Sequence, residues 1–141
     1  MENGLILTLN SYFNKKPILK GIPSNIEDIK KAENELSISF DKDYVRFLEL
    51  FGGCLIGAEE IRGLVNAEIM EDIENVVELT KECREDDSEL NSWLIIATDS
   101  SGNPIGIHSN RKVYLVDYEF DELVELASSF NEYLNICLAK T

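Results

Sequence analysis

Several residue types are scarce in this sequence, and each scarcity argues against a class of site. Histidine occurs once and cysteine three times among 141 residues, with no CxxC pair. Zinc sites need closely spaced cysteines and histidines, and disulfide frameworks use an even number of cysteines, so we expect neither. Three separate thiols are typical of a reducing compartment, and we therefore expect a cytoplasmic protein. We also expect no required cofactor.

Long apolar runs are also missing. The run at residues 5–7 is far shorter than the roughly 20 residues of a membrane-spanning helix. The N-terminus reads Met1, Glu2, Asn3, with an acid where a secretory signal carries a base. We therefore expect a protein that does not associate with membranes.

Basic residues are outnumbered by 27 acids to 13, which gives a net charge of −14. The excess is uneven: residues 59–90 hold 12 acids and 3 bases, and residues 117–132 hold 6 acids and no lysine or arginine. Such a field repels nucleic acid and anionic lipid and attracts basic proteins. The alternative is that the acidity serves only solubility.

Helix signals dominate the first half of the chain. Ser24 and Glu27 form a candidate capping box, Asp41 is a candidate N-cap, and Gly52 follows the last apolar residue of that helix. A loop with two prolines lies between the first two helices. The predicted helices cover residues 4–13, 25–36 and 42–51.

Strand signals dominate the second half. The apolar run 93–98 is typical of a central strand, and a dense turn signal follows it. The predicted strands are 93–98, 104–108, 112–118 and 122–126, and a last helix covers 129–138 after a cap at Ser128 or Ser129. Residues 54–56 and 60–65 are compatible with two short strands around Gly57. This order predicts one α+β domain, an antiparallel sheet flanked by helices.

One hydrophobic core should join these elements. The apolar positions of the helices recur at helical spacing, and those of the strands lie in apolar runs. We expect the centre of the core at Phe47, Leu48, Trp93, Phe130 and Leu134.

Three catalytic or metal-binding interpretations are weak. His108 has serines and Asp99 nearby, but no nucleophile elbow is present, and those serines belong to a turn signal. Asp99 and Asp117 could form a carboxylate pair only if their strands are neighbours. The acidic run 82–89 lacks the ligand order of a calcium loop. We therefore expect no enzymatic activity and no metal.

Three segments, taken in order, resemble the SUKH superfamily. They are the helical stretch 29–36 with Phe40-Asp41-Lys42-Asp43-Tyr44 and Phe51-Gly52-Gly53, the hairpin 95–105, and Val113-Tyr114 to Asp117 followed by residues 127–134. Phe40 and Phe51 stand where the family usually has proline and asparagine. The resemblance covers residues 24–138 and leaves 1–23 as an N-terminal helix and loop.

The resemblance implies a non-enzymatic binding protein, because many bacterial members are immunity proteins that neutralise toxin domains, often nucleases. The alternative is a regulatory scaffold of the fungal cell-wall-synthesis type. In either case the acidic blocks predict a basic protein partner. A helix starting near Asp72 would place five glutamates on one face. The candidate partner-binding residues are Glu71, Glu74, Glu78, Glu82, Glu85, Asp117, Glu119, Asp121 and Glu122, with Tyr114 and Tyr118 as aromatic anchors or as sheet-face packing.

Overall fold

The computed structural model describes residues 1–141 and is an α+β fold, as the sequence predicts. None of its helices combines the length and the apolar character that crossing a membrane requires. Its five α-helices are α1 (Asn3–Lys15), α2 (Ile26–Leu36), α3 (Lys42–Leu50), α4 (Val76–Asp86) and α5 (Phe130–Ala139). Short 3₁₀ helices are η1 (Pro17–Leu19), η2 (Glu68–Met70) and η3 (Ser88–Leu90).

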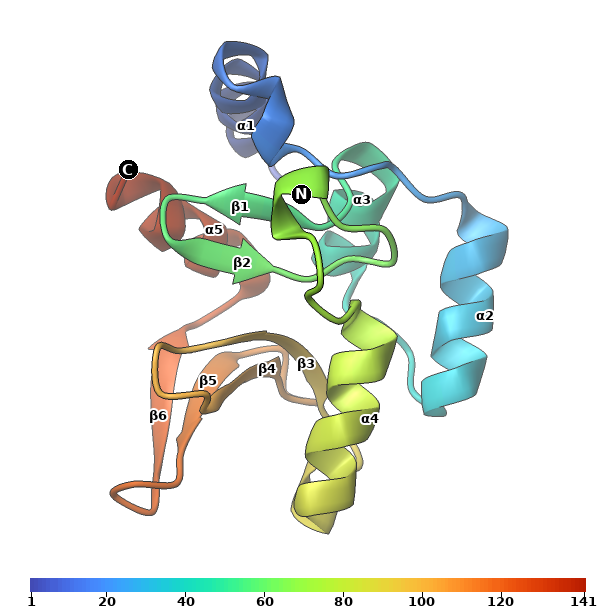
Figure 1. Cartoon of the computed structure of the whole chain (residues 1–141), viewed down its shortest axis with the longest axis vertical. Coiled ribbons are helices and arrows are strands. Elements are labelled where there is room, and N and C mark those ends of the chain that lie inside the picture. The colour runs from blue at the N-terminus through green and yellow to red at the C-terminus, as the bar shows by residue number, and fades with distance from the viewer.

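Two antiparallel sheets accompany the helices. The first is a hairpin of β1 (Cys54–Ile56) and β2 (Glu59–Ile61). The two short strands are present, but the second ends at Ile61 and not at residue 65. The second is a meander in sequence order, formed by β3 (Leu94–Thr98), β4 (Pro104–Ile107), β5 (Val113–Asp117) and β6 (Glu122–Ala127). In Figure 1, α4 runs beside β3, and the β1–β2 hairpin lies between the meander and α1.

Side-chain caps determine where most of the helices begin. Asp41 accepts two first-turn N–H groups of α3, and Ser129 caps α5, as predicted. The predicted cap at Ser24 is wrong by one residue, because Asn25 caps α2. The Ser24 N–H instead donates to the carbonyl of Leu48, which ties this loop to α3.

The main core lies between the meander, the β1–β2 hairpin and helices α1, α2, α3 and α5. Phe47 and Phe130 are fully buried, and their rings meet edge to face at 5.3 Å between centroids. Leu48 and Leu134 are also fully buried in this cluster. Their predicted central position is therefore confirmed.

Trp93 does not belong to that core, and its predicted position is wrong. Together with Leu79, Leu90 and Ile95 it forms a smaller cluster under α4. Successive side chains of a strand point to opposite faces, so the run that begins at Trp93 supplies both clusters. Gly106 lies beneath the indole, where a Cβ atom would come within 3.0 Å of it.

Helix α4 is attached to the edge of the meander at an irregularity in β3. The Thr80 hydroxyl accepts the N–H of Ile95 at 3.0 Å and donates to its carbonyl at 3.3 Å. The Arg84 guanidinium donates to the carbonyls of Leu36 and Trp93. These polar contacts fix α4 against β3 and against the end of α2.

Candidate functional site

Helix α4 begins later than the glutamate spacing predicts. Asn75 caps the helix, and Asp72 has a positive φ of 70°, which is outside the helical region. A capping box fixes this start: the Asn75 side chain accepts the Glu78 N–H, and the Glu78 carboxylate accepts the Asn75 N–H, both at 2.9 Å. Glu71 and Glu74 therefore precede the helix, and the predicted five-glutamate face is wrong for these two residues.

Glu74 forms an ion pair within the protein. Its Oε1 lies 2.6 Å from Nη2 of Arg62, whose side chain is only 6% exposed. The carbonyl of Arg62 accepts the hydroxyl of buried Tyr44 at 2.7 Å. Glu74 thus neutralises a buried cation next to the main core, and its carboxylate is not free for a partner.

The remaining acids of α4 face solvent without a cation. Glu82 and Glu85 are exposed and form no ion pair. The neighbouring cations are engaged elsewhere: Lys81 pairs with Glu35 at 2.6 Å, and Arg84 binds backbone carbonyls. The outer side of α4 therefore presents uncompensated negative charge.

The second acidic block forms the turn between β5 and β6. The Asp117 carboxylate accepts the N–H groups of Glu119 and Phe120 and so shapes the turn. Glu119, Asp121 and Glu122 are exposed and have no ion-pair partner. Glu119 and Asp121 lie in the turn itself, whereas Glu122 is the first residue of β6.

The two candidate anchor tyrosines differ in position. Tyr114 is half-buried and packs against Trp93, with ring centroids 5.6 Å apart, so sheet-face packing describes it. Tyr118 is 51% exposed, and its hydroxyl donates to Oδ2 of Asp87 at 2.8 Å. Desolvation and the Asp87 carboxylate raise the pKa of the Tyr118 hydroxyl, so it remains a donor at neutral pH.

This contact brings the two acidic blocks together, although Tyr118 and Asp87 are 31 residues apart. A shallow groove lies between η3 and the β5–β6 hairpin. We call it the acidic groove; it is lined by Asp87, Glu89, Leu90, Trp93, Val116, Asp117, Tyr118, Asp121, Glu122 and Leu123. No lysine or arginine lines it. The groove can therefore accommodate cationic side chains between carboxylates.

Exposed apolar residues of the β5–β6 hairpin are not among the predicted site residues. Phe120 is 70% exposed and Leu123 is 56% exposed, and both come from the hairpin that carries Tyr118. Asp87 and Glu89 were also absent from that set. The sequence does contain a signal that Phe120 is exposed, because this residue lies among acids and outside any apolar pattern.

The groups considered for catalysis have other roles. His108 Nδ1 accepts the N–H of Asn110 at 3.0 Å, and its ring packs on Trp93. Asp99 and Asp117 are not on neighbouring strands, because β4 separates β3 from β5. Each carboxylate instead accepts the backbone N–H groups of its own turn. No group of three or more potential metal ligands lies together.

The α+β fold, with an antiparallel meander flanked by helices, is of the SUKH type. The chain belongs to the SMI1 / KNR4 family (SUKH-1), whose sequence profile matches residues 23–136. Members of this family are generally non-catalytic binding proteins, which indicates a protein-interaction or immunity-type role. No curated protein matches the chain.

Proposed function

We propose that this chain is an immunity-type protein that neutralises a basic toxin domain by binding it through the acidic groove. The observation that carries the proposal is the Tyr118–Asp87 contact, which joins the acidic blocks at one surface. A nuclease domain must present lysine and arginine to hold phosphates, so its substrate-binding face complements such a groove. Occupying that face would block the substrate.

Acidic residues without an ion-pair partner support a basic binding partner. Among the acids of residues 59–90, Glu74 alone forms an ion pair, and the hairpin acids at 117–122 form none. Charges of one sign around a groove steer an oppositely charged partner and raise association rates by about 10- to 1,000-fold. Solubility alone does not require two separated blocks to converge.

Exposed apolar residues of the β5–β6 hairpin can supply binding energy that charge alone does not. Binding energy at protein interfaces concentrates in a few aromatic or apolar anchors that are surrounded by polar contacts. Tyr118 and Leu123 line the groove beside its carboxylates, and exposed Phe120 lies in the turn of the same hairpin. The hairpin can therefore supply both anchors and charge to the same partner.

The test is co-expression with the products of the neighbouring genes, followed by binding kinetics with any product that is toxic alone. The variant Glu89→Lys, Glu119→Lys, Glu122→Lys reverses two charges that line the groove and one in the adjoining turn. The three carboxylates make no hydrogen bond or ion pair in the structure. The matched control reverses three exposed acids at the N-terminal ends of α1 and α2, namely Glu2, Glu27 and Asp28.

We expect the groove variant to lose protection and to associate at least tenfold more slowly, with a melting temperature close to that of the unmodified protein. The control should retain protection. Raising the ionic strength should slow association of the unmodified protein and have less effect on the groove variant. Equal protection by both triple variants would contradict the acidic-groove proposal.

A further inference from the structure

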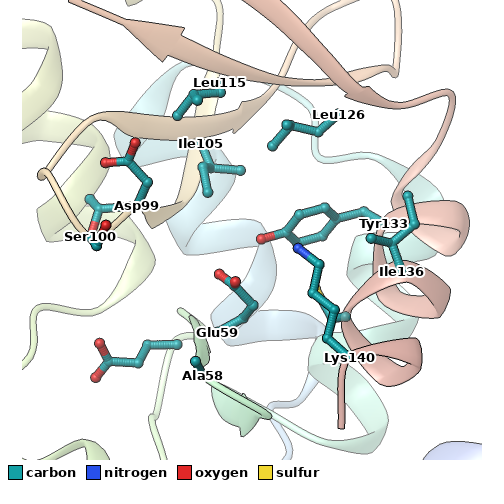
Figure 2. Close-up of a pocket in the computed structure, with 13 residues that line it drawn as sticks. Ala58, Glu59, Asp99, Ser100, Ile105, Leu115, Leu126, Tyr133, Ile136 and Lys140 are labelled. Carbon is teal, nitrogen blue, oxygen red and sulfur yellow. The ribbon is translucent and has the colours of Figure 1, made fainter. Parts of the chain in front are cut away.

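A second cavity lies on the other side of the meander, away from the acidic groove. It is open to solvent on one side, has a volume of about 540 Å³ and is lined by the β1–β2 turn, the ends of β3 and β4, strands β5 and β6, and α5. Figure 2 shows its lining side chains converging from these elements. A volume in this range is that of a small-ligand pocket.

One wall of the cavity is apolar. Ile105, Leu115, Leu126 and Ile136 come from three strands and α5 and line the same space. In Figure 2 these side chains lie on the side of the cavity toward the sheet and α5. This wall can cover the hydrocarbon part of a ligand.

A tyrosine hydroxyl provides a directional group at the inner end. Tyr133 is only 4% exposed, and its hydroxyl forms no well-aligned hydrogen bond in the protein; the Cys137 thiol, a weak hydrogen-bonding group, is its polar neighbour. Figure 2 shows this hydroxyl pointing into the cavity. Buried polar groups in folded proteins are nearly always paired, so an unpaired hydroxyl aimed into a cavity marks a place for a ligand atom. Burial raises the pKa of Tyr133, so the group is a neutral phenol.

The charges around the cavity favour a cation. Glu59, Glu60 and Asp99 line it, and none of them forms an ion pair. Lys140 is the one basic lining residue; it is exposed and extends from the last turn of α5 toward the same space. Burial raises the pKa of the Cys137 thiol to about 11, so this lining group adds no negative charge at neutral pH.

We propose that this cavity binds a primary ammonium group carried on an apolar body. The apolar wall covers the body, the Tyr133 hydroxyl accepts a hydrogen bond from the ammonium, and Glu59 provides the counter-charge. The same chemistry is offered by a small free amine and by a lysine side chain of another protein. The side chain of Lys140 competes for this position.

The test is titration of the full chain, followed by NMR, with three probes. They are 2-phenylethylamine, its anionic shape analogue phenylacetate, and Nα-acetyl-lysine-N-methylamide as a model of a protein lysine. We expect saturable shifts at cavity residues with at least one amine and none with phenylacetate. Preference for phenylethylamine identifies a small amine as the source, and preference for the lysine derivative identifies a protein side chain.

Variants separate a cation site from unspecific attraction to an acidic protein. Tyr133→Phe should weaken amine binding by roughly tenfold or more, since a hydrogen bond to a charged group is lost. Glu59→Gln should also weaken it, whereas Lys140→Ala should strengthen it by removing a like charge. Tyr114→Phe changes a tyrosine outside the cavity and should have no effect. A melting curve of Tyr133→Phe checks that the fold is retained.

Three results would overturn the proposal. The first is saturable binding of phenylacetate, especially if Lys140→Ala weakens it, because the site would then select anions. The second is amine-induced shifts at the acidic groove without shifts at the cavity. The third is an absence of saturable shifts with either amine up to millimolar concentration. None of these results bears on toxin neutralisation through the acidic groove, which is tested separately.

Discussion

Removing the carboxylate of Glu74 should destabilise the protein far more than removing other glutamates of the same acidic segment. In Glu74→Ala, Arg62 remains in place but loses its counter-charge. The matched control is Glu82→Ala, which removes an exposed carboxylate without an ion-pair partner from α4. The comparison tests whether Glu74 is a structural residue rather than part of an interface.

The expected magnitude follows from the burial of the pair. The Arg62 side chain is 6% exposed and that of Glu74 is 28% exposed, so the cation is buried and the carboxylate is partly hydrated. Removing one partner of a fully buried pair costs about 3–5 kcal/mol. Partial hydration of Glu74 reduces this, so we expect a loss of about 2–3 kcal/mol in the free energy of unfolding. Arg62 Nη1 keeps its bond to the Glu60 carbonyl, while Nε has no partner in either case.

Urea unfolding followed by circular dichroism measures both free energies. For Glu82→Ala we expect a change below about 0.5 kcal/mol, as for most exposed sites. Adding Arg62→Met to Glu74→Ala should recover part of the loss, because the uncompensated buried charge is then gone. If Glu74→Ala and Glu82→Ala lose the same small amount, the assignment of Glu74 as a structural counter-ion is wrong.

Three further outcomes are expected. Phe47→Ala, which removes a fully buried ring, should lower the free energy of unfolding by about 3–5 kcal/mol, and a melting curve that overlays the unmodified one would contradict its placement. Hydrogen bonds from the backbone N–H and hydroxyl of Ser128 lower the pKa of Glu132. These hydrogen bonds therefore stabilise the fold at pH values above the ordinary glutamate pKa, and the stabilisation is lost as the pH falls through the lowered pKa. Ser128→Ala should therefore move that pKa upward in a carboxyl-carbon NMR titration. Burial and the nearby Glu82 and Asp86 carboxylates raise the pKa of the Cys83 thiol to about 11. The rate of Cys83 alkylation should therefore rise about tenfold per pH unit between pH 7 and 9, because only the thiolate reacts. A plateau of the rate in this range would contradict the raised pKa.

Local signals in the sequence predicted most of the elements. The caps at Asp41 and Ser129 were readable because a cap depends on a side chain and the N–H groups of the next three residues. Gly52, with a φ of +70°, ends α3 as predicted. The meander was also predictable, since consecutive strands joined by short turns pair with their neighbours. The SUKH resemblance over most of the chain depended on the same local features, and the family match confirms it.

The start of α4 and the position of Trp93 are two structural features that the sequence patterns predict wrongly. Glutamate spacing favours a helix from Asp72, but the capping box at Asn75 starts α4 later, and Glu74 lies before the helix in an ion pair with Arg62, 12 residues away. The sequence places Trp93 in a single core because an apolar run does not reveal toward which face of the sheet each side chain points. Its cluster forms only because α4 covers that face of β3.

The sequence by itself determined the fold class, the family and an excess of acid in two separate blocks, since these depend on composition and local pattern. Only the tertiary structure decided which acids are free, because an ion pair depends on distance in space. The hydroxyl of Tyr118 meets Asp87 across 31 residues, which makes one acidic groove from two blocks. The unpaired hydroxyl of Tyr133 likewise becomes visible only when α5 closes against both sheets, since burial belongs to the folded chain.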